Sequence, residues 1–178
     1  MNSGIISIRY AKALLAYGNE TAAADELYRE TGRVALSFAE QPELAEALAN
    51  PVLAGQRKIE LVRAAAGGST GKPFDRFVRL LLRNKRLHLL RWICLMYGDL
   101  YRKEQHILPA RLVTAVALPE TTGAALRKRL ESLVPGATLE ILTQVKPALI
   151  GGYRFYYDTY RLDASVVSRL RAIREKLR

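Results

Sequence analysis

The spacing of apolar residues changes near Ile107, and this change limits the folds that the chain can adopt. Before Ile107, apolar residues recur about every 3.6 positions, as they do on one face of an α-helix. After Ile107 they alternate with polar residues at a period of about two, which is typical of half-buried strands. The sequence therefore predicts a helical part, residues 1–106, followed by a part that contains a sheet, residues 107–178.

The first part is predicted to be a six-helix bundle. In its first helix Ile6, Tyr10, Leu14 and Tyr17 share one face, and Gly18 supplies a stop signal. The other helices are expected at 21–39, 42–49, 56–66, 73–84 and 87–106, where prolines and glycines mark the breaks. Because the links between these helices are short, we expect them to pack into a compact bundle.

The second part is predicted to be a small α+β domain. Residues 110–116 and 139–145 each alternate in the manner of a strand with one apolar face. Pro119 starts a helix between these strands, and its apolar residues are Leu126, Leu130 and Leu133. Strands that alternate with helices in this order favour an α+β fold.

A hairpin at 150–162 and a final helix complete the predicted order. Gly151 and Gly152 precede the hairpin, and we expect them to shape the backbone where the sheet meets a helix. Asp163 is the expected N-cap of the final helix, which is predicted to begin at Ala164.

The composition is strongly basic, with 28 Lys and Arg residues against 17 Asp and Glu residues and a net charge of +11. Such an excess favours acidic proteins, nucleic acid or anionic lipid as partners, but it does not determine the fold. No apolar run approaches the roughly 20 residues that cross a bilayer. A chain of this kind that works at a membrane must be held there by other subunits.

The glycine-rich segment Gly67–Lys72 does not meet the requirements of a phosphate-binding loop. That motif needs a glycine where Ala66 stands, and a serine or threonine after the lysine, where Pro73 stands. The preceding element is also a predicted helix rather than a strand. We therefore interpret the segment as a flexible link between helices.

Other enzymatic motifs are not found either. His88 and His106 are too far apart to share one helix face, and Asp99 and Glu104 are isolated carboxylates. Cys94 has no His or acidic partner in its pattern and is expected to be a buried, unreactive thiol. We therefore predict a protein that is not an enzyme, with no catalytic residue, cofactor or metal.

A row of arginines suggests an alternative function, the binding of nucleic acid. Arg76, Arg79, Arg83 and Arg86 are spaced along one side of a predicted helix. The row can face nucleic-acid phosphates or an acidic protein, or it can remain a solvated surface. Aromatic residues do not alternate with these arginines as they do in single-strand binders. A basic nucleic-acid-binding adaptor is therefore kept only as the alternative.

The predicted hairpin is rich in aromatic residues. Alternation along the strands places about half of them in the core. Those on the outward face, together with Arg154 and Arg161, form a candidate interaction surface, since Tyr and Arg are common interface anchors. The tyrosines are Tyr153, Tyr156, Tyr157 and Tyr160.

Four segments carry a resemblance to a known family. They are Arg9–Leu14, Leu48–Pro51, Phe77–Leu87 and Leu149–Val166, and they span nearly the whole chain in the family's order. Together they resemble the delta subunit of F-type ATP synthase, whose mitochondrial counterpart is the oligomycin-sensitivity-conferring protein. Their number and order make the resemblance specific.

The resemblance implies a noncatalytic stator subunit of a proton-translocating ATP synthase, which lets rotor torque drive ATP synthesis. In this family the helical bundle, here residues 1–106, receives the N-terminal helix of an alpha subunit. The α+β domain, here residues 107–178, holds the b subunits of the peripheral stalk. The expected location is peripheral, on the cytoplasmic face of the bacterial inner membrane, with membrane contact only through the complex and no direct contact with nucleic acid.

The matching segments also imply which residues bind the alpha subunit. They lie on the first and fifth predicted helices, which form a groove suited to an amphipathic helix if they lie side by side. Core packing is the alternative for the apolar members of this set. The residues are Tyr10, Ala13, Leu14, Tyr17, Phe77, Leu80 and Asn84.

The final helix is expected to bind the b subunits through an apolar stripe, because such a stripe must pack against something. We expect its first part to cover the sheet near Val145 and Phe155. Its far end, Ile173 and Leu177, is expected to remain free for the b subunits. The stripe consists of Val166, Leu170, Ile173 and Leu177.

Overall fold

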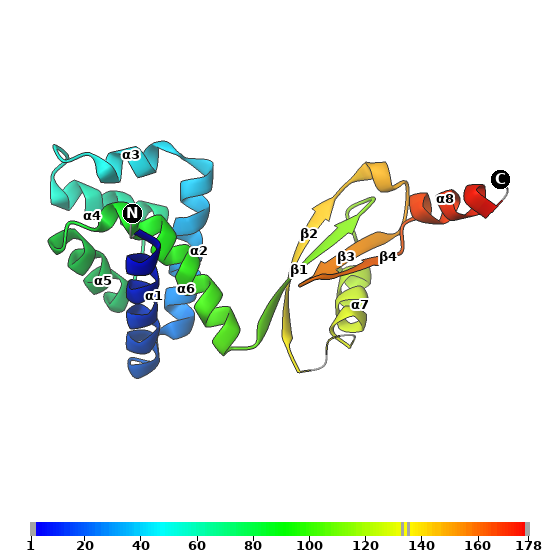
Figure 1. The fold of residues 1–178 in the computed structure, drawn as a ribbon, viewed down its shortest axis with the longest axis horizontal. Coiled ribbons are helices and arrows are strands. Elements are labelled where there is room, and N and C mark those ends of the chain that lie inside the picture. Colours follow the sequence, from blue (N-terminus) through cyan, green and yellow to red (C-terminus); the bar gives the residue numbers. More distant parts are fainter. Residues whose placement is uncertain (1–2, 133, 135, 177–178) are drawn as a thin grey trace. The chain divides into compact units, whose positions relative to one another are not determined.

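The computed structural model describes residues 3–132, 134 and 136–176, and the fold is mixed α+β (Figure 1). The chain divides after Arg102 into two compact units, called here the N-terminal unit and the C-terminal unit. Two residues with predicted roles, Leu133 and Leu177, lie outside the described residues. Within the described ranges, none of the helices has the length and apolar character that a membrane span needs.

The elements before the first strand are all helical in the described residues. The short links between them leave each helix beside its neighbours in sequence. They are α1 (Ser3–Glu20), α2 (Ala24–Glu40), α3 (Glu43–Ala49), α4 (Gly55–Ala65), α5 (Lys72–Arg83), the 3-10 helix η1 (Leu87–Leu89) and α6 (Leu90–Glu104).

The glycine-rich segment ends α4 in a defined way. The N–H of Gly68 donates to the carbonyl of Arg63 at 2.9 Å, and the N–H of Gly67 donates to the carbonyl of Ala64 at 3.0 Å. Gly67 has φ +103, so this is the glycine-terminated helix end known as a Schellman motif. The segment therefore stops a helix, in agreement with its interpretation as a link.

The core of the N-terminal unit gathers the apolar faces of five helices, α1, α2, α4, α5 and α6. These positions recur at helical spacing, and burial of each such side chain contributes about 1.5–3 kcal/mol. The largest side chains that are almost completely buried are Leu14, Leu27, Val34, Val62, Phe74, Leu81, Leu90, Ile93 and Tyr97.

The C-terminal unit contains one four-stranded sheet with the strand order β2-β1-β3-β4. β1 and β2 are parallel and are joined through α7, whereas β1–β3 and β3–β4 are antiparallel pairs. The elements are β1 (Ile107–Thr114), α7 (Glu120–Glu131), β2 (Thr138–Val145), the 3-10 helix η2 (Pro147–Leu149), β3 (Tyr153–Tyr157), β4 (Tyr160–Asp163) and α8 (Val166–Lys176). β1 stops at Thr114, so Val116, which alternation assigns to this strand, lies beyond it.

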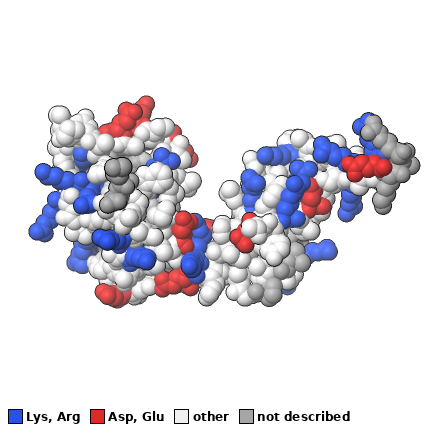
Figure 2. Space-filling view, viewed as in Figure 1, with Lys and Arg blue, Asp and Glu red and all other residues white. Residues whose placement is uncertain are grey.

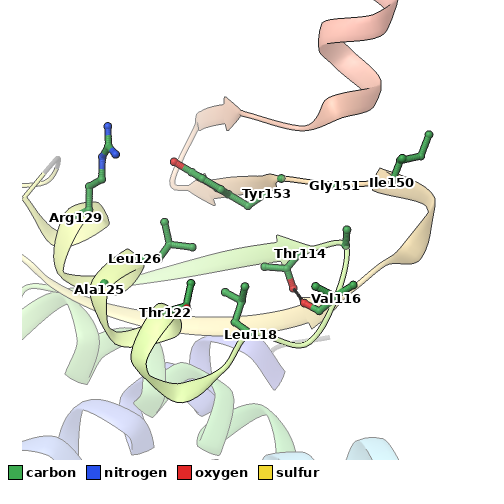
Figure 3. A pocket seen from close by; sticks show the side chains of 12 residues that line it. Thr114, Val116, Leu118, Thr122, Ala125, Leu126, Arg129, Ile150, Gly151 and Tyr153 are labelled. Carbon is green, nitrogen blue, oxygen red and sulfur yellow. Dashed lines mark hydrogen bonds between the residues drawn. The ribbon is translucent and has the colours of Figure 1, made fainter.

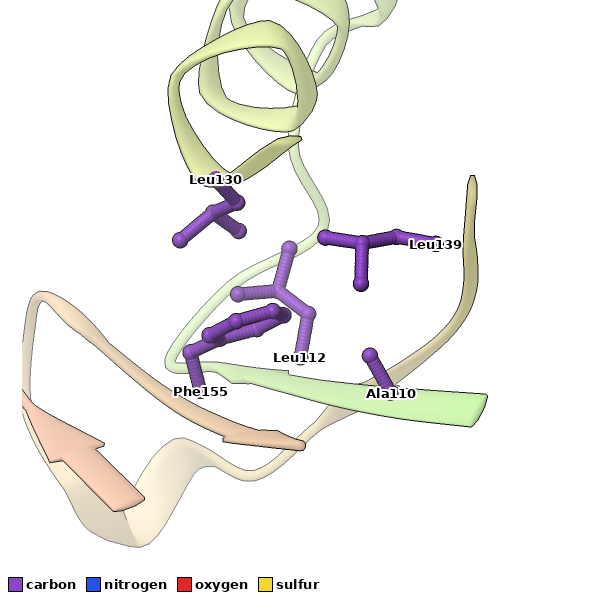
Figure 4. Close-up of a cluster of buried hydrophobic side chains, with 5 residues drawn as sticks. All are labelled: Ala110, Leu112, Leu130, Leu139 and Phe155. Atoms are coloured by element: carbon purple, nitrogen blue, oxygen red, sulfur yellow. The ribbon is translucent and has the colours of Figure 1, made fainter. Parts of the chain in front are cut away.

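α7 covers one face of this sheet, and the larger of two buried clusters in the unit lies between them (Figure 4). Ala110 and Leu112 from β1, Leu139 from β2 and Phe155 from β3 meet Leu130 from α7. Side chains along a strand point alternately to the two faces of a sheet. The strand residues of this cluster, which follow the predicted period of two, therefore all face α7 and form this core.

The expectation that α8 covers the sheet near Val145 and Phe155 is wrong. Phe155 is already buried beneath α7, and Val145 is exposed. α8 leaves the sheet after β4 and extends away from it (Figure 1), and its apolar residues Val166, Leu170 and Ile173 are exposed. The periodicity of α8 correctly indicates an amphipathic helix, but it does not identify the surface that the stripe contacts.

Gly152 is required at the junction between the sheet and α8. Its φ is +73, and a Cβ atom added there would lie 2.2 Å from the carbonyl oxygen of Ala164. We expect Gly152→Ala to lower the free energy of unfolding of the C-terminal unit by about 2 kcal/mol or more. Urea unfolding of the full chain, followed by circular dichroism, measures this change.

Gly136→Ala is the matched control for Gly152→Ala. Gly136 also has a positive φ, +89, but open space surrounds the position of an added Cβ. This variant should lose only about 1 kcal/mol of unfolding free energy, the cost of a positive φ for a residue with a Cβ atom. Equal losses in the two variants would contradict a steric role for Gly152.

Candidate partner-binding surfaces

α1 and α5 lie side by side in the N-terminal unit and are joined by aromatic packing and hydrogen bonds. The Tyr10 ring packs edge-on against Phe77, with 6.3 Å between the ring centroids. Asn84 Nδ2 donates to the Tyr10 hydroxyl at 3.0 Å, and Arg76 Nη1 donates to the Tyr17 hydroxyl at 3.2 Å. These contacts join the two helices at separate points along their length.

The structure separates the seven predicted alpha-binding residues into two groups. Leu14 and Phe77 are buried in the core, so they cannot contact a partner without rearrangement of the unit. This core placement corrects the expectation for these two residues. Ala13, Leu80 and Asn84 are exposed, Leu80 to 45%, while Tyr10 and Tyr17 are half-buried between the helices.

The exposed group forms one surface, called here the α1–α5 surface, which consists of Tyr10, Ala13, Tyr17, Leu80 and Asn84. Its tyrosine hydroxyls accept hydrogen bonds from Arg76 of α5 and from Asn84, the residue after α5, and both tyrosines are half-buried, so only part of each side chain is left for a partner. Arginines on α5 border it, among them the exposed Arg79 and Arg83. On the face shown in Figure 2, basic side chains spread over both units and acidic ones gather in fewer places.

Asp75 fixes the start of α5 and therefore one side of this surface. Its carboxylate accepts from Arg63 Nε at 3.0 Å, from Arg63 Nη2, and from the Thr70 hydroxyl at 2.8 Å. The hydrogen bonds from Arg63 lower the pKa of Asp75 the most, and they outweigh the opposing effect of burial. An ionised Asp75 at a helix start is also favoured by the helix dipole.

Glu30 of α2 holds the link before α5 from the other side. It accepts the Gly71 N–H at 2.5 Å, and it is buried. Burial raises the pKa of Glu30, and the hydrogen bond from Gly71 opposes this rise. The glycine-rich link is thus positioned by polar contacts to α2 and by Asp75.

The start of α8 in the C-terminal unit depends on Asp163. Its carboxylate accepts from the N–H of Ser165 at 3.0 Å and from the hydroxyls of Ser165 and Ser168, and it pairs with Arg154 and Arg161. Burial opposes ionisation, but these hydrogen bonds outweigh it and hold the pKa of Asp163 far below its usual value.

The predicted cap of α8 is therefore corrected by two residues, from Asp163 to Ser165. The helix begins at Val166 rather than Ala164, and the Ser165 hydroxyl accepts the N–H of Ser168 at 3.4 Å, as an N-cap does. Asp163 positions this capping serine instead of capping the helix itself. Serine and aspartate are both common caps, so the sequence alone does not choose between them.

The tyrosines of the hairpin divide between the two faces of the sheet, as alternation predicts. Tyr153 and Tyr157 pack against the core beneath α7, and Tyr157 stacks on Tyr160 with 5.2 Å between the centroids. Tyr156 lies on the opposite face, where the guanidinium of Arg111 is 4.7 Å and that of Arg161 is 5.9 Å from its ring centroid. This face therefore joins aromatic and basic groups, and Tyr156 is half-buried because it also packs against the small buried cluster of Val113, Ala115 and Leu149.

Groups capable of catalysis are not assembled in the part of the chain that the structure describes. Cys94 is buried, and burial raises the pKa of its thiol. His88 and His106 are both exposed, and no group of three or more His, Cys, Asp or Glu side chains is placed to hold a metal ion within the described ranges. Both units present exposed apolar and basic side chains, as proteins that bind other proteins do.

A model of the family described as "ATP synthase delta (OSCP) subunit" matches residues 6–177. The chain belongs to this family, whose members are noncatalytic structural components of ATP synthase. The predicted family and the prediction that the chain is not an enzyme are confirmed. Nothing in these similarities supports the nucleic-acid-binding alternative.

The similarity to curated relatives covers nearly the whole chain. The chain is 40% identical over 177 residues to the ATP synthase subunit delta of Phocaeicola vulgatus, covering 99% of this chain and 95% of the relative. It is 30% identical to that of Synechococcus sp., covering 92% and 89%. A chain in the Toxoplasma gondii mitochondrial ATP synthase hexamer has the same fold, with a TM-score of 0.63, 19% identity and 96% coverage of both chains.

Several residues that position these surfaces have no clear signal in the sequence. Arg63, Thr70 and Glu30 meet near the start of α5 although they come from different parts of the chain. Arg111 of β1 lies directly opposite Tyr156 of β3 in the antiparallel pair of strands. The contacts become visible only when the helices and strands are packed, because periodicity reports the face of one element and not its neighbour.

The paired Asp75 makes a pH dependence predictable. Its folded-state pKa is lowered, so its stabilising contribution is complete above the unfolded value of about 3.9 and is lost as the pH falls through the folded-state pKa. We expect Asp75→Asn to remove this part of the acid-dependent loss of stability. Thermal unfolding midpoints of both proteins from neutral pH downward measure it.

Asp99→Asn is the control for this experiment. Asp99 pairs with Arg102 on the surface, and its side chain is 65% exposed, so the pair contributes little. In this variant the unfolding midpoint should fall with pH as steeply as it does in the wild-type protein. An equally steep fall in Asp75→Asn as well would show that Asp75 does not link pH to stability.

Proposed function

We propose that this chain joins the catalytic head of ATP synthase to its peripheral stalk by binding a different subunit with each unit. Residues 1–106 bind the N-terminal helix of an alpha subunit, and residues 107–178 bind the b subunits. The chain then keeps the head from turning with the rotor, so that proton-driven torque is used for ATP synthesis. Membership of the delta (OSCP) family supports this role.

The observation that carries the first contact is the exposed Leu80 of α5, on the side of this helix whose residues contact α1. Leu80 is 45% exposed and lies one helical turn from Phe77 and from Asn84, which both contact Tyr10 of α1. An amphipathic helix that lies along this surface buries Leu80 and the exposed parts of Tyr10 and Tyr17. The basic border formed by α5 fits a helix with acidic residues beside its apolar face.

The second contact is assigned to α8. Ile173 is 55% exposed and follows Val166 and Leu170 on one side of the helix. An amphipathic helix that does not pack on its own sheet presents its apolar side to a partner. Leu177 is proposed for the same contact from the sequence pattern alone, since it lies outside the described residues.

We place the complex at the cytoplasmic face of a bacterial inner membrane. The chain is then peripheral, and its contact with the membrane is made only through the other subunits. Apolar contacts with a charged rim suit this position, because they resist a sustained load without a covalent link.

Leu80→Asp tests the alpha-subunit contact. A charge placed in an apolar contact costs a few kcal/mol unless it is paired, so we expect at least about tenfold weaker binding of a peptide with the alpha N-terminal sequence. The fold should be retained, because Leu80 is already partly in water. Calorimetric titration of the full chain measures the affinity, and circular dichroism checks the fold.

Leu36→Asp is the control for Leu80→Asp. Leu36 is an exposed leucine on α2 and does not belong to the α1–α5 surface. We expect this variant to bind the alpha peptide as the wild-type protein does. If Leu80→Asp also binds normally, the alpha subunit is bound elsewhere on the chain.

Removal of residues 172–178 tests the stalk contact. The loss of Ile173 and Leu177 should release the b subunits and spare the alpha peptide, because the two contacts lie in different units. Pulldown with the soluble part of the b subunit, beside calorimetry with the alpha peptide, measures both. If b is still bound with full affinity, the α8 assignment is wrong and the tyrosine-rich hairpin becomes the candidate.

A further inference from the structure

An apolar hollow opens at the end of the C-terminal unit, between α7 and the segment that precedes β3 (Figure 3). Its volume is about 460 Å³. Its walls come from the end of β1 and the turn after it, from one side of α7, and from the segment Ile150–Tyr153. The volume is within the range of pockets that hold ligands or side chains.

The hollow is continuous with the core of the unit. Leu118, Leu126 and Tyr153 line it, and all three also pack against the buried cluster around Phe155. None of these three side chains is fully buried. An apolar group that enters from outside would therefore extend the existing core and remove further apolar surface from water.

Ile150 stands at the edge of the hollow in a strained conformation. Its backbone has φ 62 and ψ −40, and the N–H of Gly151 donates across it to the carbonyl of Leu149 at 2.6 Å. This is a tight three-residue turn of the rare, strained kind, and a β-branched residue is especially unfavourable at positive φ. The Ile150 side chain is 71% exposed, so burial within the chain does not compensate for this strain.

The opposite edge of the hollow is basic. Arg129 of α7 lines it, and in Figure 3 Arg129 and Ile150 lie towards opposite ends of the labelled residues. Among the described residues no carboxylate lies within ion-pairing distance of Arg129. An acidic group on a bound partner would complement this charge.

The hollow also adjoins the start of α8. Gly151, which lines it, accepts the N–H of Val166 at 3.0 Å through its carbonyl oxygen. Val166 is the first residue of the exposed apolar stripe that continues through Leu170 to Ile173. The hollow and the stripe therefore meet at Gly151 and Val166.

We propose that the hollow is the anchoring site for the stalk helix, and that it receives an apolar side chain of an amphipathic helix of the b subunit. A carboxylate on the same helix pairs with Arg129, and the helix packs against Ile150. This assignment rests on the proposed function of the C-terminal unit. The α8 contact buries the stripe of this chain against the partner. The hollow, in contrast, would enclose a side chain of the partner.

Ile150→Gly separates a binding role from a structural one. Glycine relieves the positive φ, so the free energy of unfolding should stay the same or rise. The affinity for the soluble part of the b subunit should fall about tenfold or more, because the apolar contact between the partner helix and the edge of the hollow is lost. Calorimetry and urea unfolding on the full chain give the two readouts.

Two matched variants isolate the cause. Asp158→Gly relieves a positive φ of 46 at the exposed tip of the hairpin, away from the hollow. Arg129→Glu reverses the charge in the hollow, and Arg127→Glu reverses a charge on the same helix that does not line it. Ile150→Gly and Arg129→Glu should weaken binding of the b fragment, whereas Asp158→Gly and Arg127→Glu should not.

The outcomes distinguish this proposal from the function on which it rests. If Ile150→Gly binds the b fragment as tightly as the wild-type chain, or Arg129→Glu weakens binding no more than Arg127→Glu, the hollow is not the anchoring site. If removal of residues 172–178 still abolishes binding in that case, the proposed stalk contact stands without the hollow. If the wild-type chain does not bind the b fragment, the proposed function of the C-terminal unit fails first, and the hollow fails with it.

Discussion

Each unit of this chain must bury its apolar side chains within itself, and the surfaces offered to partners are those that this burial leaves over. In the N-terminal unit, the buried Phe77 packs against Tyr10 and joins α5 to α1. Leu80, one turn further along α5, remains on the surface. In the C-terminal unit, α7 covers one face of the sheet and Tyr156 is half-buried against a smaller cluster on the other face, whereas the stripe of α8 stays exposed.

The same electrostatic arrangement fixes the two helices that carry the proposed contacts. Asp75 near the start of α5 and Asp163 before α8 each accept hydrogen bonds from an arginine and from hydroxyl groups. Both carboxylates have lowered pKa values and are ionised at neutral pH. Charged hydrogen bonds of this kind are stronger than neutral ones, and they hold a helix end in one orientation. A subunit that carries load needs such fixed helix ends.

Much of the fold follows from local patterns, and most of the errors concern neighbours in space. The change of period near Ile107 correctly separates helices from strands, and Gly67 and Gly68 correctly end a helix. The apolar stripe of α8 is real, but its contact with the sheet is absent, because α7 already occupies the face that buries Phe155. Leu14 and Leu80 illustrate the same limit, since both fit the pattern of a partner surface and only Leu80 is exposed.

The sequence by itself determined the elements, their order and the family, because periodicity, helix stops and short motifs are properties of neighbouring residues. The tertiary structure alone decided which apolar side chains are enclosed and which face water. Exposure depends on residues that are distant in sequence, as the packing of α7 over β3 shows. It also decided the conformation of Ile150, whose positive φ no local preference would indicate. A side chain that is unfavourable by itself is placed there by the turn that leads from η2 into β3.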